Sequence, residues 1–279
     1  GAGKTTTISM LLGILQPTAG EVRLFGETLQ SNPFEIKRRI GVVAEYLSFY
    51  NEMTAWEYLQ FFGELYRVEN ADTRAEYLLD RLTLWDFKDA LVGAYSTGMK
   101  RKLGLARALM HSPDVLMMDE PVSGLDPYGI IQVREVLEET LAEGKTILIC
   151  SHILSEVERT VNRVGIIAKG RLLVEDTMDN IRERVGGERH VEVEIVEVKD
   201  GLIPALEGLP FVTRVHNDGG RLSVYTSDEQ DYRAELGRVI AESGGIIQGM
   251  RTVQASLEEA FVIITESHIS RFAGEQHGH

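Results

Sequence analysis

The chain begins with the stretch Gly1-Ala2-Gly3-Lys4-Thr5-Thr6, which is the strongest indication of its fold. It matches the second half of a phosphate-binding loop, whose full pattern also has a glycine five residues before Gly3. The backbone N–H groups of this stretch can converge on phosphate oxygens at the start of a helix. In that pattern Lys4 bridges the β- and γ-phosphates of a nucleotide, and the Thr5 hydroxyl binds Mg²⁺.

The composition is that of a globular protein with one large or two modest domains. The 279 residues are 43% hydrophobic and 26% charged. The net charge of −14 argues against a nucleic-acid-binding surface. No apolar run approaches the ~18 residues of a membrane span. The single Cys150 excludes an internal disulfide and fits a reducing cytoplasm.

Strand and helix patterns alternate over the first two thirds of the chain. Apolar runs of strand length occur at residues 40–44, 115–118 and 146–150, and helical patterns at residues 8–15 and 129–143. A shorter strand is expected over residues 21–25, and a hairpin over 164–174. Residues of about 46–110 predict a helical insertion between strands. The order predicts an α/β P-loop NTPase core with a mainly parallel sheet and its chemistry at the carboxyl ends of the strands.

The pattern changes after Arg184. Gly186-Gly187-Glu188 predicts a linker between a first domain, residues 1–185, and a second domain, residues 189–279. Alternating residues from His190 and the turn Asn217-Asp-Gly-Gly220 indicate strands and a hairpin. Helical patterns follow the first of these strands and precede the last one. This βαββαβ order predicts a small ferredoxin-like α+β domain.

Two acidic residues and one histidine follow neighbouring buried strands. Asp119 ends the run at 115–118, where its carboxylate can reach Mg²⁺, and Glu120 is placed to accept a proton from an attacking water. The alternative is an acidic pair on a solvated loop. His152 follows the next strand, and we expect it to sense the γ-phosphate and orient Glu120. A lone histidine at a strand end is otherwise structural or exposed.

A second anion-binding helix start is predicted at Tyr95-Ser-Thr-Gly-Met99. Ser96 and Gly98 would present a hydroxyl and backbone N–H groups at the beginning of the next helix. One chain does not need two phosphate cradles for one nucleotide, so the second makes sense if it completes the pocket of a neighbouring copy. The alternative is an ordinary helix cap, followed by a basic and solvated first turn.

Together these motifs resemble the ATP-binding subunits of ABC transporters, over roughly residues 1–185. The matching segments are the end of Walker A, the signature at Tyr95–Met99, Walker B ending at Asp119 and Glu120, the D-loop at Ser123–Asp126, and the switch His152. The similarity is strongest to subunits of ABC-2-type exporters. These often carry a small C-terminal domain that ends in a segment like Leu257-Glu-Glu-Ala-Phe261.

The resemblance implies a reaction and partners. ATP and Mg²⁺ would bind, two copies would face each other head to tail as a homodimer, and a membrane-embedded permease would be driven at the inner face of the cell membrane. Ser96 and Gly98 of one copy would close on the γ-phosphate held by Lys4 of the other. Asp126 would cross the interface and couple the two sites. No nucleic-acid partner is expected.

Two departures from the family pattern affect the nucleotide site. Glu45 stands where the family usually has Gln, and its carboxylate can still reach Mg²⁺ or water while adding negative charge near the triphosphate. The opening of Walker A and the aromatic residue that stacks on adenine would precede Gly1. We therefore expect this fragment to bind ATP poorly and to be impaired as an ATPase.

Two other functions compete with that of an exporter subunit. A soluble ABC-type ATPase acting on ribosomes or nucleic acid usually fuses two ATPase halves or inserts long coiled coils, and neither is seen here. In the other hypothesis the C-terminal domain is the functional centre, with stabilisation of a dimer as its role.

In the exporter hypothesis the permease would dock in a groove near Glu45. The candidates for this groove are aromatic residues that also suit the core of the helical insertion: Trp56, Tyr58, Phe61 and Phe62.

Overall fold

The computed structural model describes residues 2–184, 190–196, 199, 201–227, 230–253, 257–258, 260–262 and 264–265. The chain forms two compact units, the first of residues 1–160 with 169–171 and the second of residues 161–168 with 172–279. Gly1 and the predicted linker Gly186-Gly187-Glu188 lie outside the described residues. The domain boundary at residues 185–189 therefore stays a prediction.

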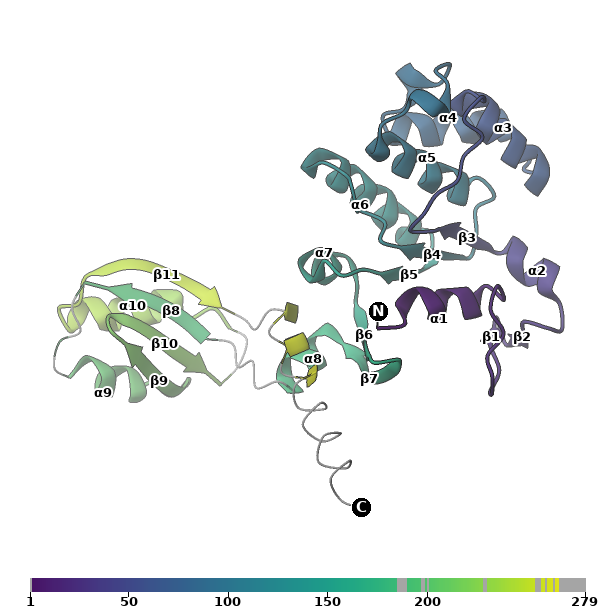
Figure 1. Ribbon diagram of the computed structural model, residues 1–279. Helices are drawn as coiled ribbons and strands as arrows, with labels where there is room; N and C mark the ends of the chain where they lie inside the picture. The colour runs from purple at the N-terminus through teal and green to yellow at the C-terminus, as the bar shows by residue number, and fades with distance from the viewer. Residues whose placement is uncertain are drawn as a thin grey trace. The chain divides into compact units, whose positions relative to one another are not determined.

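A three-stranded parallel sheet forms the centre of the first unit. Its strands are β3 (Ile40–Val43), β4 (Val115–Asp119) and β5 (Thr146–Cys150), in the order β3-β4-β5. Helix α1 (Lys4–Leu11) packs against β4, while α5 (Thr97–Leu109) packs against β3 and α6 (Pro127–Ala142) against β5. Figure 1 shows α1 on one side of the sheet and α5 and α6 on the other. Covering on both faces explains the continuous apolar runs of these strands and confirms the predicted parallel core.

The helical insertion is also confirmed. It consists of α3 (Ala55–Tyr66), α4 (Ala71–Arg81), two 3₁₀ turns (η1, Trp85–Phe87; η2, Val92–Ala94) and α5. Thr54 and Glu57 form a capping box that starts α3, with the Glu57 N–H donating to Thr54 Oγ1 at 3.1 Å. Tyr58 is only 1% exposed in the core of the insertion. It is therefore a core residue, which removes it from the docking candidates.

The segment between α1 and α2 (Pro33–Arg38) differs from the sequence prediction. The helix ends at Leu11, before the apolar Leu15, and Gly13 follows with a φ of 65°. The strand expected over residues 21–25 is reduced to β1 (Arg23–Leu24), which pairs with β2 (Glu27–Thr28). Phe25 and Gly26 have φ values of 56° and 82°, so the chain turns where an extended strand was expected.

The second unit begins with the predicted hairpin, β6 (Arg163–Ala168) and β7 (Arg171–Thr177), followed by α8 (Met178–Arg184). Its main part has the predicted βαββαβ order. The six elements are β8 (His190–Ile195), α9 (Leu202–Glu207), β9 (Val212–Asp218), β10 (Arg221–Thr226), α10 (Arg233–Glu242) and β11 (Ile247–Val253). The strands form an antiparallel sheet in the order β11-β8-β10-β9. Alternate residues of β8 are buried with Leu236 and Ile240 of α10, which confirms the ferredoxin-like fold.

Candidate active site

The predicted acidic residues Asp119 and Glu120 lie at the carboxyl end of β4, next to the carboxyl end of β5. Asp119 is opposite Cys150 in the parallel register, and the Glu120 N–H donates to the Cys150 carbonyl oxygen at 2.8 Å. Glu120 has a φ of 53°, which non-glycine residues rarely adopt. This left-handed backbone turns the chain out of β4 at the residue predicted to act on water, and strained conformations of this kind cluster at functional sites.

The Glu120 carboxylate lies in contact with the segment that follows β5. His152 Nδ1 is 2.8 Å from Glu120 Oε2, and the Ser151 hydroxyl donates to the same oxygen at 3.3 Å. Glu120 is 8% exposed, whereas the His152 side chain is 67% exposed. The histidine therefore contacts the carboxylate with one ring nitrogen while most of its ring faces solvent. This geometry suits the role predicted for it, that of orienting Glu120.

The start of α1 carries the predicted phosphate-binding residues. Gly3 has a φ of 107°, and the Thr7 hydroxyl donates to its carbonyl oxygen at 2.8 Å. Thr5 and Thr6 are exposed at the beginning of the helix. Among the described residues, no carboxylate forms an ion pair with Lys4. Backbone donors and an ammonium group without a partner carboxylate fit a bound triphosphate.

Lys4 also lies within electrostatic range of the strand ends. The pKa of the Cys150 thiol is raised to about 11, mainly by burial; Asp119 and Glu120 also raise it, and Lys4 lowers it. The positive group of α1 and the two carboxylates therefore act on the same thiol. The Ala2 carbonyl oxygen accepts a hydrogen bond of 2.9 Å from the Gly170 N–H, which fixes the chain just before Lys4.

The predicted Mg²⁺ ligands match the chemistry of that ion in part. Asp119 is only 4% exposed, and within the described part of the chain no cation makes a direct ion pair with it. Buried carboxylates without a partner are costly, so a cation fits this position. No cluster of three or more acidic, histidine or cysteine side chains that could hold a metal occurs among the described residues.

The signature residues lie beside the D-loop of the same chain. The Ser96 hydroxyl accepts from the Met99 N–H at 3.2 Å and starts α5. A Cβ on Gly98 would lie 3.5 Å from Leu125 and 3.6 Å from the Gly124 carbonyl oxygen. Asp126 starts α6 by accepting from the Gly129 N–H at 2.9 Å. No hydrogen bond or ion pair between described residues connects Ser96 or Asp126 to Lys4.

The basic turn at the start of α5 is only partly solvated, because Arg101 is buried while Lys100 and Lys102 are half-buried. Arg101 is 8% exposed, and its Nη1 donates to the Ala44 carbonyl oxygen at 3.0 Å. Arg107 Nη2 donates to the Val42 carbonyl oxygen at 3.1 Å. Neither contact was predicted from the sequence, although Arg101 precedes the buried Leu105 by one helical turn and so lies on the apolar face of α5.

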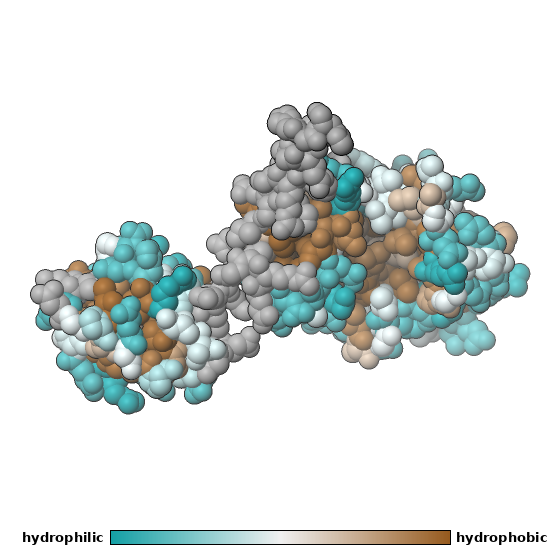
Figure 2. Space-filling model, turned by 90° about the horizontal axis from the view of Figure 1, so that it is seen from below, coloured by the Kyte–Doolittle hydropathy of each residue, from teal (hydrophilic) through white to brown (hydrophobic). Residues whose placement is uncertain are grey.

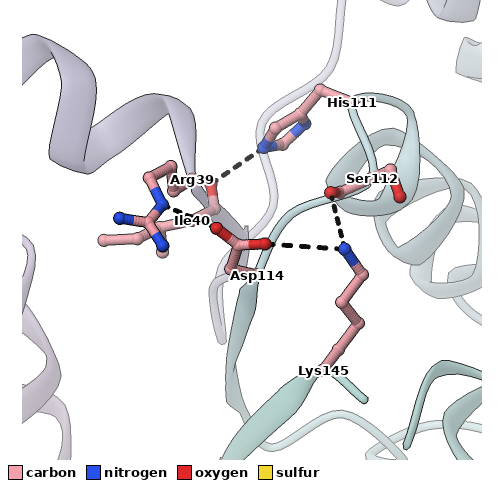
Figure 3. A network of polar contacts seen from close by, with 6 residues as sticks. All are labelled: Arg39, Ile40, His111, Ser112, Asp114 and Lys145. Carbon is pink, nitrogen blue, oxygen red and sulfur yellow. Dashed lines mark hydrogen bonds and ion pairs between the residues drawn. The ribbon is translucent and has the colours of Figure 1, made fainter. Parts of the chain in front are cut away.

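A third side chain continues this row of contacts. His111 Nε2 lies 3.1 Å from the Ile40 carbonyl oxygen, as drawn in Figure 3. The carbonyl groups of Ile40, Val42 and Ala44 alternate along the outer side of β3, which has a strand neighbour only at β4 among the described strands. Helix side chains thus pair with the edge of the sheet, in the way that proteins cover such edges.

Another contact missed from the sequence joins the signature helix to α6. Lys102 Nζ donates to Gln132 Oε1 and, at 3.2 Å, to Thr83 Oγ1. Gln132 is 5% exposed. Burial lowers the pKa of the Lys102 ammonium, and Asp126 opposes this effect. A polar contact inside the first unit therefore links the helices that begin at Ser96 and at Asp126.

Comparisons with known proteins identify the family. The family described as ABC transporter matches residues 1–123. The chain is 38% identical over 264 residues to the bacitracin transport ATP-binding protein BcrA of Bacillus licheniformis, covering 94% of this chain and 84% of that protein. It is 37% identical over 272 residues to the Nod factor export ATP-binding protein I of Ralstonia nicotianae, covering 95% and 82%. The daunorubicin resistance ATP-binding protein DrrA3 of Streptomyces coeruleorubidus is 30% identical over 269 residues, covering 95% and 84%.

A solved structure supports the same assignment. The structure of an ATP-binding subunit of an ABC transporter matches with a TM-score of 0.63 and 32% identity, over 66% of this chain and 78% of that one. The chain therefore belongs to the ATP-binding subunits of ABC transporters, and it is an ATPase of the exporter type that the sequence motifs indicated. The relatives do not favour the alternative of an ATPase acting on ribosomes or nucleic acid. Of the described helices, none has the length and apolar character to cross a membrane.

Proposed function

We propose that this chain hydrolyses ATP to drive export through a membrane-embedded permease subunit, at the inner face of the cell membrane. The observation that carries the proposal is the contact of Glu120 with His152 at the strand ends, close to Asp119 and to the start of α1. Lys4 binds the phosphates. Glu120 accepts a proton from the attacking water, and His152 holds the carboxylate in position.

Mg²⁺ completes the site in this proposal. Thr5, Asp119 and Glu45 are the residues that would hold it, by the hydroxyl and carboxylate chemistry that Mg²⁺ prefers. When bound, the ion neutralises charge on the phosphates. The buried Asp119, for which no direct ion pair is found among the described residues, supports this assignment.

A second ATP-binding subunit supplies the other half of the site. Ser96 and Gly98 lie beside Gly124 and Leu125 of their own chain, away from any described contact with Lys4. We propose that two copies associate head to tail, so that the signature residues of one copy bind the γ-phosphate held by its partner. The hydrogen bond from Lys102 to Gln132 joins α5 to α6, so the signature and the D-loop would move as one unit when the two copies associate.

We propose that the permease docks on a groove of about 420 Å³ between α2 and the end of α3. This groove differs from the one predicted near Glu45, since neither Glu45 nor the aromatic candidates of α3 named from the sequence line it. Its apolar part includes Phe34 and Leu65, which are 82% and 61% exposed. Its charged part consists of Lys37, Arg38 and Arg67 together with Glu35, which forms an ion pair with Arg38 at 3.8 Å, so the net charge of the lining is positive. Figure 2 shows apolar residues at the surface of the first unit. Exposed apolar surface often marks interaction sites. A cytoplasmic helix of the permease with apolar and acidic side chains fits this groove.

The test is affinity purification of the full-length protein from detergent-solubilised native membranes, with partners identified by mass spectrometry. A polytopic membrane protein in near-equal amount is expected, and ribosomal or DNA-associated partners without a membrane subunit would refute the proposal. Phe34→Asp should release the permease and leave ATP affinity unchanged. Phe87→Asp is the matched control, because Phe87 is 50% exposed and does not line the groove.

A further inference from the structure

Helix α5 and strand β3 are held together unusually closely. A Cβ on Gly41 would lie 2.4 Å from the Ala108 carbonyl oxygen, so the helix approaches the strand as only a glycine permits. The row of contacts from His111, Arg107 and Arg101 then pairs with the carbonyl groups of Ile40 and Val42 in the strand and of Ala44, the residue that follows it. A displacement of α5 must therefore displace the end of β3.

Arg101 differs from the other two members of the row by its surroundings. Arg101 is 8% exposed as a whole residue, and its charge interacts electrostatically with three carboxylates, those of Glu45, Glu120 and Asp119, without a direct ion pair to any of them. Its hydrogen bond to the Ala44 carbonyl group fixes the backbone immediately before Glu45. Arg107 instead contacts the Val42 carbonyl group and the Tyr58 hydroxyl, at 3.2 Å, on the side of the helical insertion.

We propose that Arg101 is a positioning residue for Glu45 in the ATPase site. It anchors the backbone at Ala44 and balances the negative charge that Glu45 adds next to Asp119 and Glu120. With Arg101 in place, a carboxylate at position 45 is compatible with a bound triphosphate. Because Arg101 lies on the helix that Ser96 begins, it also links the position of the signature to that of Glu45. This inference rests on the ATPase function and assigns a residue to it.

The experiment is a double-mutant cycle on the full-length protein with Arg101→Met and Glu45→Gln. ATP affinity is measured in EDTA, where no hydrolysis occurs, and thermal unfolding is measured without nucleotide. Arg101→Met should weaken ATP binding at least tenfold when Glu45 is present. In the Glu45→Gln background the same change should weaken binding less than threefold. The fall in the melting temperature should persist in both backgrounds, because the bond to the Ala44 carbonyl group is lost in each.

Two further variants separate charge from structure. Arg101→Lys keeps the charge and should retain ATP affinity within threefold of the unsubstituted protein, which tests the proposal even if Arg101→Met folds poorly. Arg107→Met removes the neighbouring contact of the row, and its effect on ATP affinity should be the same with Glu45 and with Glu45→Gln.

The outcomes distinguish this inference from the function on which it rests. Equal effects of Arg101→Met in both backgrounds, with normal ATP binding by the unsubstituted protein, would overturn the positioning role alone. Loss of affinity in Arg101→Lys as severe as that in Arg101→Met would do the same. Failure of the unsubstituted full-length protein to bind ATP would overturn the ATPase site itself.

Discussion

The two ends of the parallel sheet differ in how their charges are arranged. At the amino end, Asp114 forms a hydrogen-bonded ion pair with Arg39 at 2.6 Å and a second ion pair with Lys145 at 3.5 Å, as Figure 3 shows. At the carboxyl end, Glu45 and Asp119 have no ion pair among the described residues, and Glu120 contacts His152 and the Ser151 hydroxyl but no lysine or arginine.

This difference separates charges that are paired within the fold from charges that are available to a ligand. Direct pairs at the amino end connect the starts of β3, β4 and β5 and leave little charge to attract anything else. At the carboxyl end the carboxylates are held close to Lys4 and Arg101 without being paired, so a nucleotide and its metal ion can interact with them. Perturbed and incompletely paired charges of this kind are typical of functional sites. The comparison makes four predictions, from the largest effect on the protein to the smallest.

The largest effect is expected for Glu120→Gln. It removes the group that we propose as the proton acceptor and keeps the size of the side chain, so ATP hydrolysis should fall by ~10²–10⁴-fold. Nucleotide affinity should change by less than about threefold, since the phosphate contacts come from α1. Steady-state ATPase rates and equilibrium binding measure the two quantities. Glu52→Gln, at an exposed glutamate, is the control, and hydrolysis above one tenth of the normal rate in Glu120→Gln would contradict the assignment.

A smaller effect is expected for His152→Ala. His152 positions the carboxylate without accepting the proton, and a misplaced catalytic group costs up to ~10²-fold in rate. We expect kcat to fall by ~10- to 100-fold, less than in Glu120→Gln. His216→Ala changes an exposed histidine of the second unit and should leave the rate unaltered. A combined variant that is slower than Glu120→Gln alone by the full His152→Ala factor would show that the two residues act independently.

The carboxyl end was largely predictable from the sequence, because its residues belong to motifs with fixed spacing. Lys4, Asp119, Glu120 and His152 all lie where strand ends and a helix start were predicted. Their roles in ATP hydrolysis remain predictions. The left-handed backbone of Glu120 was not predictable, because Glu has no preference for that conformation.

The contacts that support this end could not be predicted, because they join residues distant in sequence. Arg101 reaches Ala44 across 57 positions, and Arg39 reaches Asp114 across 75. No local pattern states which carbonyl or carboxylate a long basic side chain will bind. The short β1–β2 hairpin was missed for another reason, since a turn at Phe25-Gly26 has weak local signals beside an apolar run.

At the amino end, Asp114→Asn should affect stability and not activity. The hydrogen bond from Arg39 is the main reason that the pKa of Asp114 lies below its usual range, and Lys145 adds to it. All three side chains are partly exposed, so we expect a loss of only ~0.5–1 kcal/mol in the free energy of unfolding. ATPase activity should stay within about twofold of normal.

The pH dependence of this loss has a definite sign. A carboxyl whose pKa is lower in the folded state stabilises the protein above its unfolded pKa of about 3.9, and that contribution disappears as the pH falls through the folded value. Urea unfolding should therefore show a constant difference between Asp114→Asn and the unsubstituted protein above about pH 5, and a shrinking one below about pH 4. A difference that grows on acidification would contradict the ion pair.

The smallest effect concerns Cys150, which reports on the electrostatics of the carboxyl end. With a pKa of about 11 its thiolate fraction at pH 8 is about one in a thousand, against about one in four for an ordinary thiol. Alkylation by iodoacetamide should be correspondingly slow in the folded protein and fast in urea. Since Lys4 lowers this pKa, Lys4→Met should slow alkylation further, by a factor of about two to five. Lys145→Met removes a cation from the other end of the sheet and should leave the rate unchanged. Equal rates in Lys4→Met and Lys145→Met would mean that the charge of Lys4 does not act on the strand ends. Lys4 would then not be the positive group that lies close to the unpaired carboxylates at the carboxyl end of the sheet.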